Sequence, residues 1–245
     1  MRIAELTGGP VVDTIYAQIL QPCFPPAEMC TIQSMHYLAG AGRGLFWTAL
    51  DEQGTVLGCA IGDWDEGPRV VLLSWIAIRP GLRGGGIGGA LLDAAQAEWI
   101  ARYSPCLILA EVEDPACHDG SEAYGDPRAR LLFYQRRGAR ILDIPYFQAS
   151  LAPDKPRVPG LLLMVLHADE QFAGSEPDTI DGAVLRQYLE LYQRQCEGQV
   201  ATGEEAAGLW EAIDRPGGVP LLSPGDVGKW VRGDPAAPGG HSGTA

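Results

Sequence analysis

A run of five glycines within six positions constrains the fold of this chain most. The glycines lie between Gly84 and Gly89, with Ile87 as the exception, and Arg83 stands directly before them. The preceding stretch Val70–Ile78, VVLLSWIAI, predicts a strand in the middle of a sheet. After the loop, apolar residues recur four positions apart, which is typical of one helix face. A strand, a glycine loop and a helix in this order predict a phosphate-binding unit.

The segments around this unit predict a mixed α/β domain over residues 1–168. We expect a first helix at Thr14–Leu20, and a second central helix that begins with Asp126-Pro127 and ends at Gly138. Asp63–Pro68 is expected to form a turn. The predicted strands are Arg2–Leu6, Gly44–Leu50, Thr55–Ile61, Val70–Ile78, Cys106–Val112, Ala139–Phe147 and Leu161–His167.

Beyond Asp169 the pattern changes to amphipathic helices. Asp181–Cys196 carries apolar residues on one face, and Glu204–Ile213 predicts another helix. We therefore expect a helical C-terminal extension over residues 169–232, followed by a disordered tail over 233–245 that is rich in Gly, Pro and Ala. The apolar helix face must be buried, and we expect it to pack on its own sheet. Pairing in a homodimer or covering the mouth of an active site are the alternatives.

Composition restricts the partners of the chain. The net charge of −13 argues against nucleic acid and anionic membranes as partners, because both need a basic face on the protein.

The longest apolar run, around Gly160–Leu166, is too short to span a bilayer, and the N-terminus has no apolar signal segment, so we expect a cytoplasmic protein. The six cysteines are scattered without a C-x-x-C pair and there are only four histidines, so no metal site is expected.

The glycine loop fits a dinucleotide-binding template superficially. Gly84, Gly86 and Gly89 satisfy G-x-G-x-x-G, and Glu111 lies downstream at a strand end, where a ribose-binding acid would be. However, Arg79–Arg83 separate the strand from the first glycine, whereas the fingerprint needs that glycine at the turn itself. The first seventy residues also predict a helix and hairpins rather than repeated βαβ units.

A second template fits better. Arg83-Gly84-Gly85-Gly86-Ile87-Gly88 resembles the Arg/Gln-x-x-Gly-x-Gly/Ala loop of the GNAT superfamily of N-acetyltransferases, and Tyr134-Gln135-Arg136-Arg137-Gly138 resembles its Tyr-x-x-x-Gly signature. Backbone N–H groups at a helix N-terminus can hold the pyrophosphate of coenzyme A, and glycines permit the close approach. The resemblance covers about residues 1–168. It implies a GNAT fold, a mixed and mostly antiparallel central sheet flanked by helices, here with a helical C-terminal extension.

The resemblance also implies roles for individual residues. Acetyl-CoA is the expected cosubstrate. Tyr134 is the candidate general acid and Glu111 the tentative general base, with Glu113 second and His118 a weaker choice. The alternative for Glu111 is an exposed charge at the end of a strand, without a catalytic role. The alternative for Tyr134 is an aromatic side chain that only packs on its helix. The expected cofactor-binding residues supply backbone groups on the central strand and the phosphate loop, namely Ile76, Ala77, Ile78, Arg83, Gly84, Gly85, Gly86, Ile87, Gly88 and Gly89.

The predicted function is transfer of the acetyl group of acetyl-CoA to a primary amine of an unidentified small molecule or protein. The alternative is a non-catalytic GNAT-like domain that binds acyl-CoA as a sensor or assembly module. We expect the amine pocket beside the first helix, the loop after it with His36 and Tyr37, and the loop before the last strand. Asp63, Asp65 and Glu66 could attract a cation there, but a solvated turn is the simpler interpretation.

Overall fold

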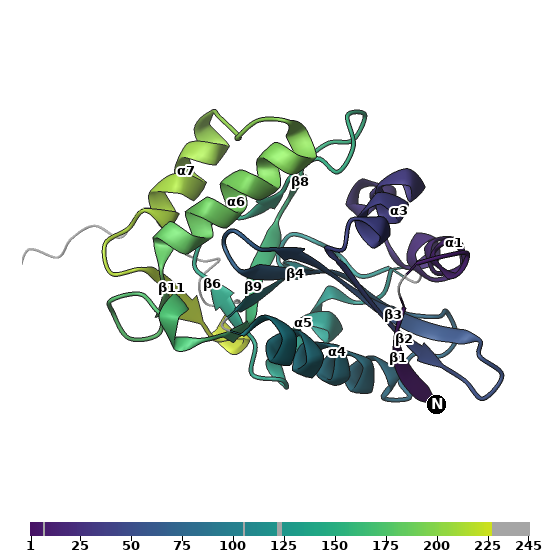
Figure 1. Ribbon diagram of the computed structural model, residues 1–245. Coiled ribbons are helices and arrows are strands. Elements are labelled where there is room, and N and C mark those ends of the chain that lie inside the picture. The colour runs from purple at the N-terminus through teal and green to yellow at the C-terminus, as the bar shows by residue number, and fades with distance from the viewer. Residues whose placement is uncertain (7, 105, 122–123, 227–245) are drawn as a thin grey trace, which may run out of the picture.

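The computed structural model describes residues 1–6, 8–104, 106–121 and 124–226. The tail expected to be disordered lies outside the described residues, as do residues 227–232 of the extension. Nine strands form one sheet in the order β1-β2-β3-β4-β5-β9-β6-β11-β10, and β7 pairs with β8 in a small second sheet (Figure 1). The strands are β1 Arg2–Leu6, β2 Gly44–Leu50, β3 Val56–Asp65, β4 Val70–Ile78, β5 Leu107–Glu113, β6 Arg140–Leu142, β7 Phe147–Gln148, β8 Val158–Pro159, β9 Leu161–Ala168, β10 Thr179–Ile180 and β11 Val219–Leu222.

Helices lie on both faces of the sheet. The helical segments are α1 Val11–Ile15, the π-helix η1 Tyr16–Leu20, α2 Gln21–Cys23, the 3-10 turn η2 Pro26–Glu28, α3 Ile32–Gly40, α4 Ile87–Tyr103, α5 Pro127–Gln135, the 3-10 turn η3 Glu170–Phe172, α6 Gly182–Glu197, α7 Glu204–Ile213 and the 3-10 turn η4 Pro224–Asp226. Among the described residues, no helix combines the length and the apolar character that crossing a bilayer requires.

Three hydrophobic clusters fix this arrangement. On one face, α4 and α5 pack with Leu91, Trp99 and Leu131 against β4 and β5. On the opposite face, α1 to α3 cover the N-terminal half of the sheet, while α6 and α7 cover the other half. Figure 1 shows these two groups of helices above the sheet, with α4 and α5 below it. The mixed α/β fold expected from the sequence is confirmed.

The two central strands separate along their length. β4 and β5 are the parallel pair, but their pairing covers only Val70–Leu73 with Leu107–Ala110. Beyond that point β4 stays paired with β3, and β5 stays paired with β9. A β-bulge adds Ser74 to β4 at the same level, where Trp75 faces Ile61 and Leu73 faces Gly62. The strands therefore open a wedge in the middle of the sheet.

Several elements differ from the expectation. The first helix starts at Val11 and continues through a π-helix, and β3 runs to Asp65, so Asp63 and Asp65 belong to a strand rather than a turn. The predicted strand Ala139–Phe147 is divided into β6 and β7 around Pro145, because proline removes a ladder hydrogen bond.

The C-terminal extension is built into the main sheet. The apolar face of α6 is buried through Leu185, Tyr188 and Leu189, in the cluster that includes β5 and β9. The extension also supplies two strands that the sequence pattern did not predict: β11 pairs with β6, and β10 pairs with β11. Intramolecular packing of α6, the expected arrangement, is therefore confirmed. The domain boundary at residue 168 stays a prediction.

Candidate active site

The glycine loop ends in a left-handed cap at the N-terminus of α4. Gly86 is the N-cap residue with φ of 77°, and Gly84 has φ of 90°. A Cβ at either position would meet no atom within 4 Å, so backbone conformation rather than space requires glycine there. At Gly89, in contrast, a Cβ would collide with the guanidinium of Arg137. The first turn of this 17-residue helix thus presents free N–H groups to an anion.

The wedge exposes alternate backbone groups of β4. The Arg79 N–H donates to Leu57 O on the β3 side at 2.8 Å, and N–H directions alternate along a strand. By this alternation, Ile76 and Ile78 turn their N–H groups into the wedge, whereas Ala77 turns toward β3. The Cys23 thiol contacts Ile78 O at 3.6 Å, which agrees with that direction. Two of the three predicted strand residues therefore offer backbone donors to a ligand.

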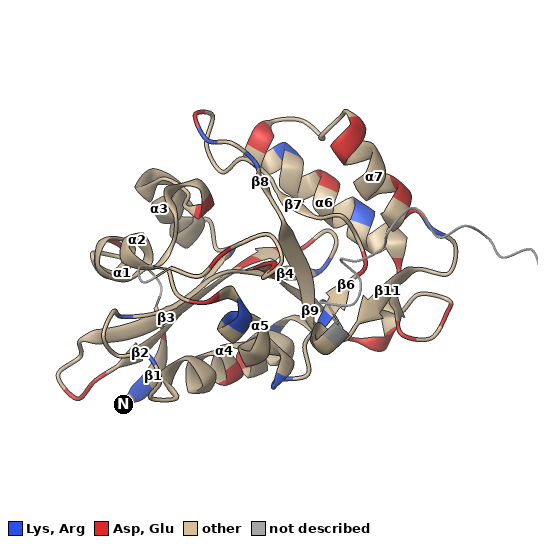
Figure 2. Ribbon diagram, turned by 180° about the vertical axis from the view of Figure 1, so that it is seen from behind, with Lys and Arg blue, Asp and Glu red and all other residues tan. Residues whose placement is uncertain are grey.

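A cavity of about 640 Å³ joins the wedge to the glycine loop. Its charged lining is mainly basic: Arg83, Arg130, Arg136 and Arg137 accompany Glu111 and Asp126. Figure 2 shows basic residues on α5 beside this region. Of the predicted cofactor residues, Gly85 and Ile87 do not line this cavity. Those that do are Ile76, Ala77, Ile78, Arg83, Gly84, Gly86, Gly88 and Gly89. We refer to this space as the cofactor cavity.

Tyr134 lies on α5 and lines the cofactor cavity. It is only 4% exposed. Burial raises the pKa of the phenol, although Arg130 and Arg137 oppose this effect. The hydroxyl therefore keeps its proton at neutral pH, as a proton donor must.

A second cavity, of about 780 Å³, lies on the other side of the wedge. We call it the acceptor cavity. Its walls come from α3, from residues 151–153 and from α6, which contributes Tyr192, Gln195 and Cys196. The two cavities share Ser74, Trp75 and Glu111 in their linings. These three residues therefore mark the junction at which a group bound in one cavity can meet a group bound in the other.

Glu111 is held at the junction by three donors. The Tyr146 hydroxyl donates to Oε1, the Gln148 Nε2 donates to Oε2 at 2.7 Å, and the Tyr192 hydroxyl donates to Oε1 at 3.2 Å. Burial raises the pKa of the Glu111 carboxyl, and the three hydrogen bonds oppose that effect. A half-buried carboxylate with a raised pKa suits proton abstraction from an amine.

The other predicted acids and histidines have different surroundings. Glu113 forms an ion pair with Arg130 and lines neither cavity. His118 Nε2 lies 3.1 Å from Pro159 O, in keeping with a loop residue. His36 pairs with Asp13, whereas Tyr37 lines the acceptor cavity as expected.

One cluster of charges contributes Arg43 and Asp63 to the lining of the acceptor cavity. Arg43 pairs with Asp63 at 3.0 Å and with Asp65 at 2.8 Å, and it donates to Gln195 Oε1 at 3.1 Å. Burial raises the pKa of Asp63, with Asp65 adding to the effect and Arg43 opposing it. The solvated turn expected for Asp63 and Asp65 is thus wrong, because both residues belong to β3 and both carboxylates pair with Arg43.

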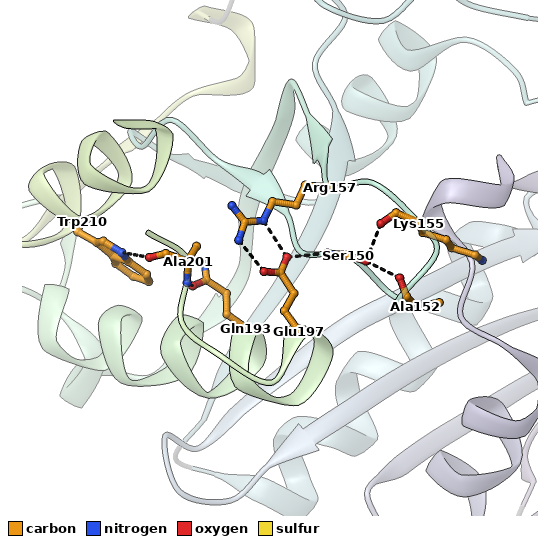
Figure 3. A network of polar contacts seen from close by, with 8 residues as sticks. All are labelled: Ser150, Ala152, Lys155, Arg157, Gln193, Glu197, Ala201 and Trp210. Atoms are coloured by element: carbon orange, nitrogen blue, oxygen red, sulfur yellow. Dashed lines mark hydrogen bonds and ion pairs between the residues drawn. The ribbon is translucent and has the colours of Figure 1, made fainter. Parts of the chain in front are cut away.

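The extension also fixes the loop over the acceptor cavity (Figure 3). Glu197 at the end of α6 accepts two hydrogen bonds from Arg157, at 2.8 and 2.6 Å, and one from the Ser150 N–H at 2.9 Å. The Ser150 hydroxyl binds Ala152 O and Lys155 O within the loop. Lys155 Nζ then donates to Met29 O on the opposite rim. A helix distant in sequence therefore positions one wall of the site.

Sequence reasoning missed Tyr146 and Gln148, which donate to Glu111, and it missed Glu28, whose pKa Glu111 affects. Gln148 is a polar residue that follows an apolar stretch, which is the signal that could have found it. Glu28 carries a carboxyl whose pKa is raised to about 7, chiefly by burial and then by Glu113 and Glu111. The partners of Glu111 come from β7, from Tyr146 directly before β7, and from α6, so a local motif does not contain them.

One side-chain cluster away from both cavities has the donors of a metal site. Cys106, His167 and Asp169 offer ligand atoms that lie within 4.8 Å of one another. Asp169 Oδ2 already accepts the Cys106 N–H at 2.6 Å, so this carboxylate anchors the start of β5.

A splayed parallel pair, a glycine-capped helix and a basic cavity between them define a class of acyl-CoA-binding acyltransferases. Comparison with known proteins agrees: residues 42–138 match the family model described as "Acetyltransferase (GNAT) domain". The chain therefore contains a GNAT acetyltransferase domain, and the acyltransferase class expected from the loop is confirmed.

A solved structure with a TM-score above 0.5 shows the same fold. A protein assigned to the GNAT acetyltransferases of Bacteroides thetaiotaomicron is 22% identical, with a TM-score of 0.57, over 79% of this chain and 99% of that chain. The ribosomal-protein-S18-alanine N-acetyltransferase of Escherichia coli is 20% identical, with a TM-score of 0.48, over 69% of this chain and 96% of its own. No curated protein sequence matches the chain significantly.

Proposed function

We propose that this protein transfers the acetyl group of acetyl-CoA directly to a primary amine, with Glu111 as general base and Tyr134 as general acid. The observation that carries the proposal is the junction of the two cavities at Ser74, Trp75 and Glu111. A thioester held in the cofactor cavity and an amine held in the acceptor cavity would meet there. Proximity of this kind lowers the barrier of a two-substrate reaction.

The residues of the chain supply each proton step. Glu111 takes a proton from the ammonium, and the freed nitrogen lone pair attacks the thioester carbon. N–H groups of Ile76 and Ile78 can stabilise charge that develops on the thioester oxygen. The C–N bond forms and the C–S bond breaks, and the Tyr134 hydroxyl gives its proton to the sulfur. The second proton lost from the nitrogen restores the Tyr134 hydroxyl through solvent.

Two cysteines in the acceptor cavity favour direct transfer over a covalent acetyl-enzyme. Cys30 and Cys196 both line it. Burial raises the pKa of Cys30 to about 11 and the pKa of Cys196 to about 12. Both thiols are therefore protonated at neutral pH, and a thiol is a poor nucleophile compared with its thiolate.

The pyrophosphate of acetyl-CoA fits the N-terminus of α4, and the arginines of the cofactor cavity suit its negative charge. Calorimetric titration with acetyl-CoA tests this assignment. A free-thiol release assay over a panel of primary amines then tests the transfer. Binding with no transfer to any amine would favour the acyl-CoA sensor instead, and no binding would reject both functions.

A further inference from the structure

The cluster of Cys106, His167 and Asp169 lies where β5 begins and β9 ends, and none of its residues lines the cofactor cavity or the acceptor cavity. A thiol sulfur, an imidazole nitrogen and a carboxylate oxygen from these residues lie within 4.8 Å of one another. Zn²⁺ binds all three kinds of donor in proteins, whereas Mg²⁺ and Ca²⁺ take oxygen ligands. The cluster therefore has the chemistry of a zinc site.

The register of β5 with β9 places the three side chains on one face of the sheet. Ile108 faces His167, and Leu107 faces Ala168, so the next pair in this register is Cys106 with Asp169. The Asp169 N–H donates to Cys106 O at 3.2 Å, in keeping with that pairing. Side chains two residues apart on a strand share a face. The cluster thus arises from sheet pairing, and for this reason the scattered cysteines of the sequence did not predict it.

The imidazole of His167 contains a buried nitrogen that makes no hydrogen bond to a described residue. This atom is Nε2, and it lies 3.4 Å from Asp169 Oδ2. In a tetrahedral zinc site, a nitrogen and an oxygen that are each about 2.0–2.1 Å from the ion stand about 3.3 Å apart. The observed separation therefore matches two ligands of one ion. Coordination would also offset the free energy that Nε2 loses when it is buried without a partner.

The carboxylate of Asp169 is held in place and is open to solvent. Its Oδ2 accepts the Cys106 N–H at 2.6 Å, and hydrogen bonds of this kind orient metal-ligating carboxylates. Cys106 is buried, whereas the side chains of His167 and Asp169 are 23% and 28% exposed. The cluster therefore extends from the core to the surface, and an ion can enter beside Asp169.

We propose that Cys106, His167 and Asp169 bind one Zn²⁺, with water in the fourth position, and that this ion links the start of β5 to the end of β9. The Cys106 thiol gives its proton to solvent when its sulfur coordinates the ion. Leu107, at this end of β5, pairs with Val70 of β4, so the ion lies at the closed end of the wedge. We therefore expect it to stabilise the fold and to leave acetyl transfer unchanged. This role does not depend on the proposed function.

Metal titration of the full chain tests the site directly. After treatment with a chelator, calorimetric titration with Zn²⁺ should give about one ion per chain with a Kd of about 1 μM or below, and a roughly 1,000-fold excess of Mg²⁺ should not compete. Co²⁺ reports the ligands, because coordination by a thiolate adds a charge-transfer band in the near ultraviolet. Absence of Zn²⁺ binding, or a Co²⁺ complex without this band, would overturn the proposal and leave His167 and Asp169 as an ion pair.

Two variants test the assigned ligands. Cys106→Ala removes the sulfur, and Asp169→Asn removes the negative charge but keeps an oxygen that can accept the Cys106 N–H. Each should weaken Zn²⁺ binding by about 100-fold or more. Cys117→Ala is the matched control, because Cys117 is exposed and stands beside His118, so it tests adventitious binding. Wild-type affinity in folded Cys106→Ala and Asp169→Asn, or loss of binding in Cys117→Ala, would overturn the proposal.

Thermal unfolding tests the stabilising role. We expect Zn²⁺ at about 100 times its Kd to raise the Tm of the wild type by about 5–10 °C, and Asp169→Asn to lose most of this gain. An unchanged Tm would refute the link between β5 and β9. Acetyl transfer, where it is measured, should agree within about twofold between metal-free and zinc-loaded protein, since the ion stabilises folded protein without contacting either cavity. A chain that binds Zn²⁺ but transfers no acetyl group would refute the proposed function and leave this inference standing.

Discussion

The cofactor cavity and the acceptor cavity meet at three residues, yet the chain builds them in different ways. The cofactor cavity is lined mostly by a continuous β-loop-α unit and by the next helix, with Cys23 and Phe24 as its contribution from the N-terminal region. The acceptor cavity combines residues from Cys30 to Cys196. One side is therefore set mainly by local backbone geometry, whereas the other depends on contacts between segments far apart in sequence.

The two cavities also differ in charge. Arginines predominate around the cofactor cavity, where a pyrophosphate is expected. Among the described residues that line the acceptor cavity, Arg43 is the single arginine and is paired with two aspartates, so Glu111 and Asp63 leave an acidic balance. Under the proposed function, we expect this contrast to direct an anionic cosubstrate to one cavity and a cationic acceptor to the other.

Removing the carboxylate shared by both cavities should have the largest effect. We expect Glu111→Gln to lower kcat by about 100- to 10,000-fold, the range for general acid–base catalysis, while the acetyl-CoA Kd changes little. Because burial raises the pKa of Glu111, wild-type kcat/KM should rise with pH through a value above the usual 4.5, and this limb should disappear in the variant. Glu113→Gln, on the same strand but outside both cavities, is the control. Wild-type turnover by Glu111→Gln would disprove the base assignment.

The next largest effect should come from the cofactor side. Tyr134→Phe removes the proposed donor to the sulfur, and we expect kcat to fall about 10- to 100-fold with a nearly unchanged acetyl-CoA Kd. Tyr103→Phe removes a hydroxyl from a ring that stacks on Trp64 outside the cavity, and it should retain full activity. If chemistry is shown to limit the rate and Tyr134→Phe still matches the wild type, Tyr134 is only a packed aromatic.

The same contrast explains what the sequence could predict. The cofactor side follows from local patterns: the strand Val70–Ile78, the helix after the glycine loop and the Asp126 N-cap all lie where the pattern predicted them. The acceptor side depends on tertiary contacts, such as those that bring Tyr146 and Tyr192 to one carboxylate.

Short or unusual strands were missed for related reasons. β10 has two residues, too few for a periodic signal, and it forms by pairing with β11 and through a bridge between Ile180 and Ala173. Asp65 ends β3 against the usual preference of aspartate for turns, because Arg43 and Gln195 satisfy its carboxylate. In each case a partner distant in sequence decides the local structure.

A smaller effect tests whether the glycine loop acts through its backbone. An alanine at Gly86 would have to adopt a left-handed conformation, which costs roughly 1–2 kcal/mol, so we expect acetyl-CoA affinity to fall about 5- to 30-fold. Gly54→Ala is the matched control, since Gly54 has φ of 83° and open space but lies outside both cavities. It should lose similar stability and keep full affinity, and equal loss of affinity in both variants would refute the loop assignment.

The smallest expected effect concerns the acidic groups around the junction. The Glu28 carboxyl has a pKa near 7 instead of 4.5, because it is partly buried and faces Glu113 and Glu111, although Arg130 and His118 partly compensate. Folded protein therefore holds this proton more tightly than the unfolded chain, and its stability falls as pH rises from about 4.5 to about 7. Glu28→Gln should raise the free energy of unfolding at pH 8 by about 1 kcal/mol, a value reduced for partial solvation, and should have little effect at pH 4.5. Denaturant unfolding at both pH values measures this difference, with Glu52→Gln in an exposed turn as the control. An equal gain at both pH values would show that the proton on Glu28 is not responsible.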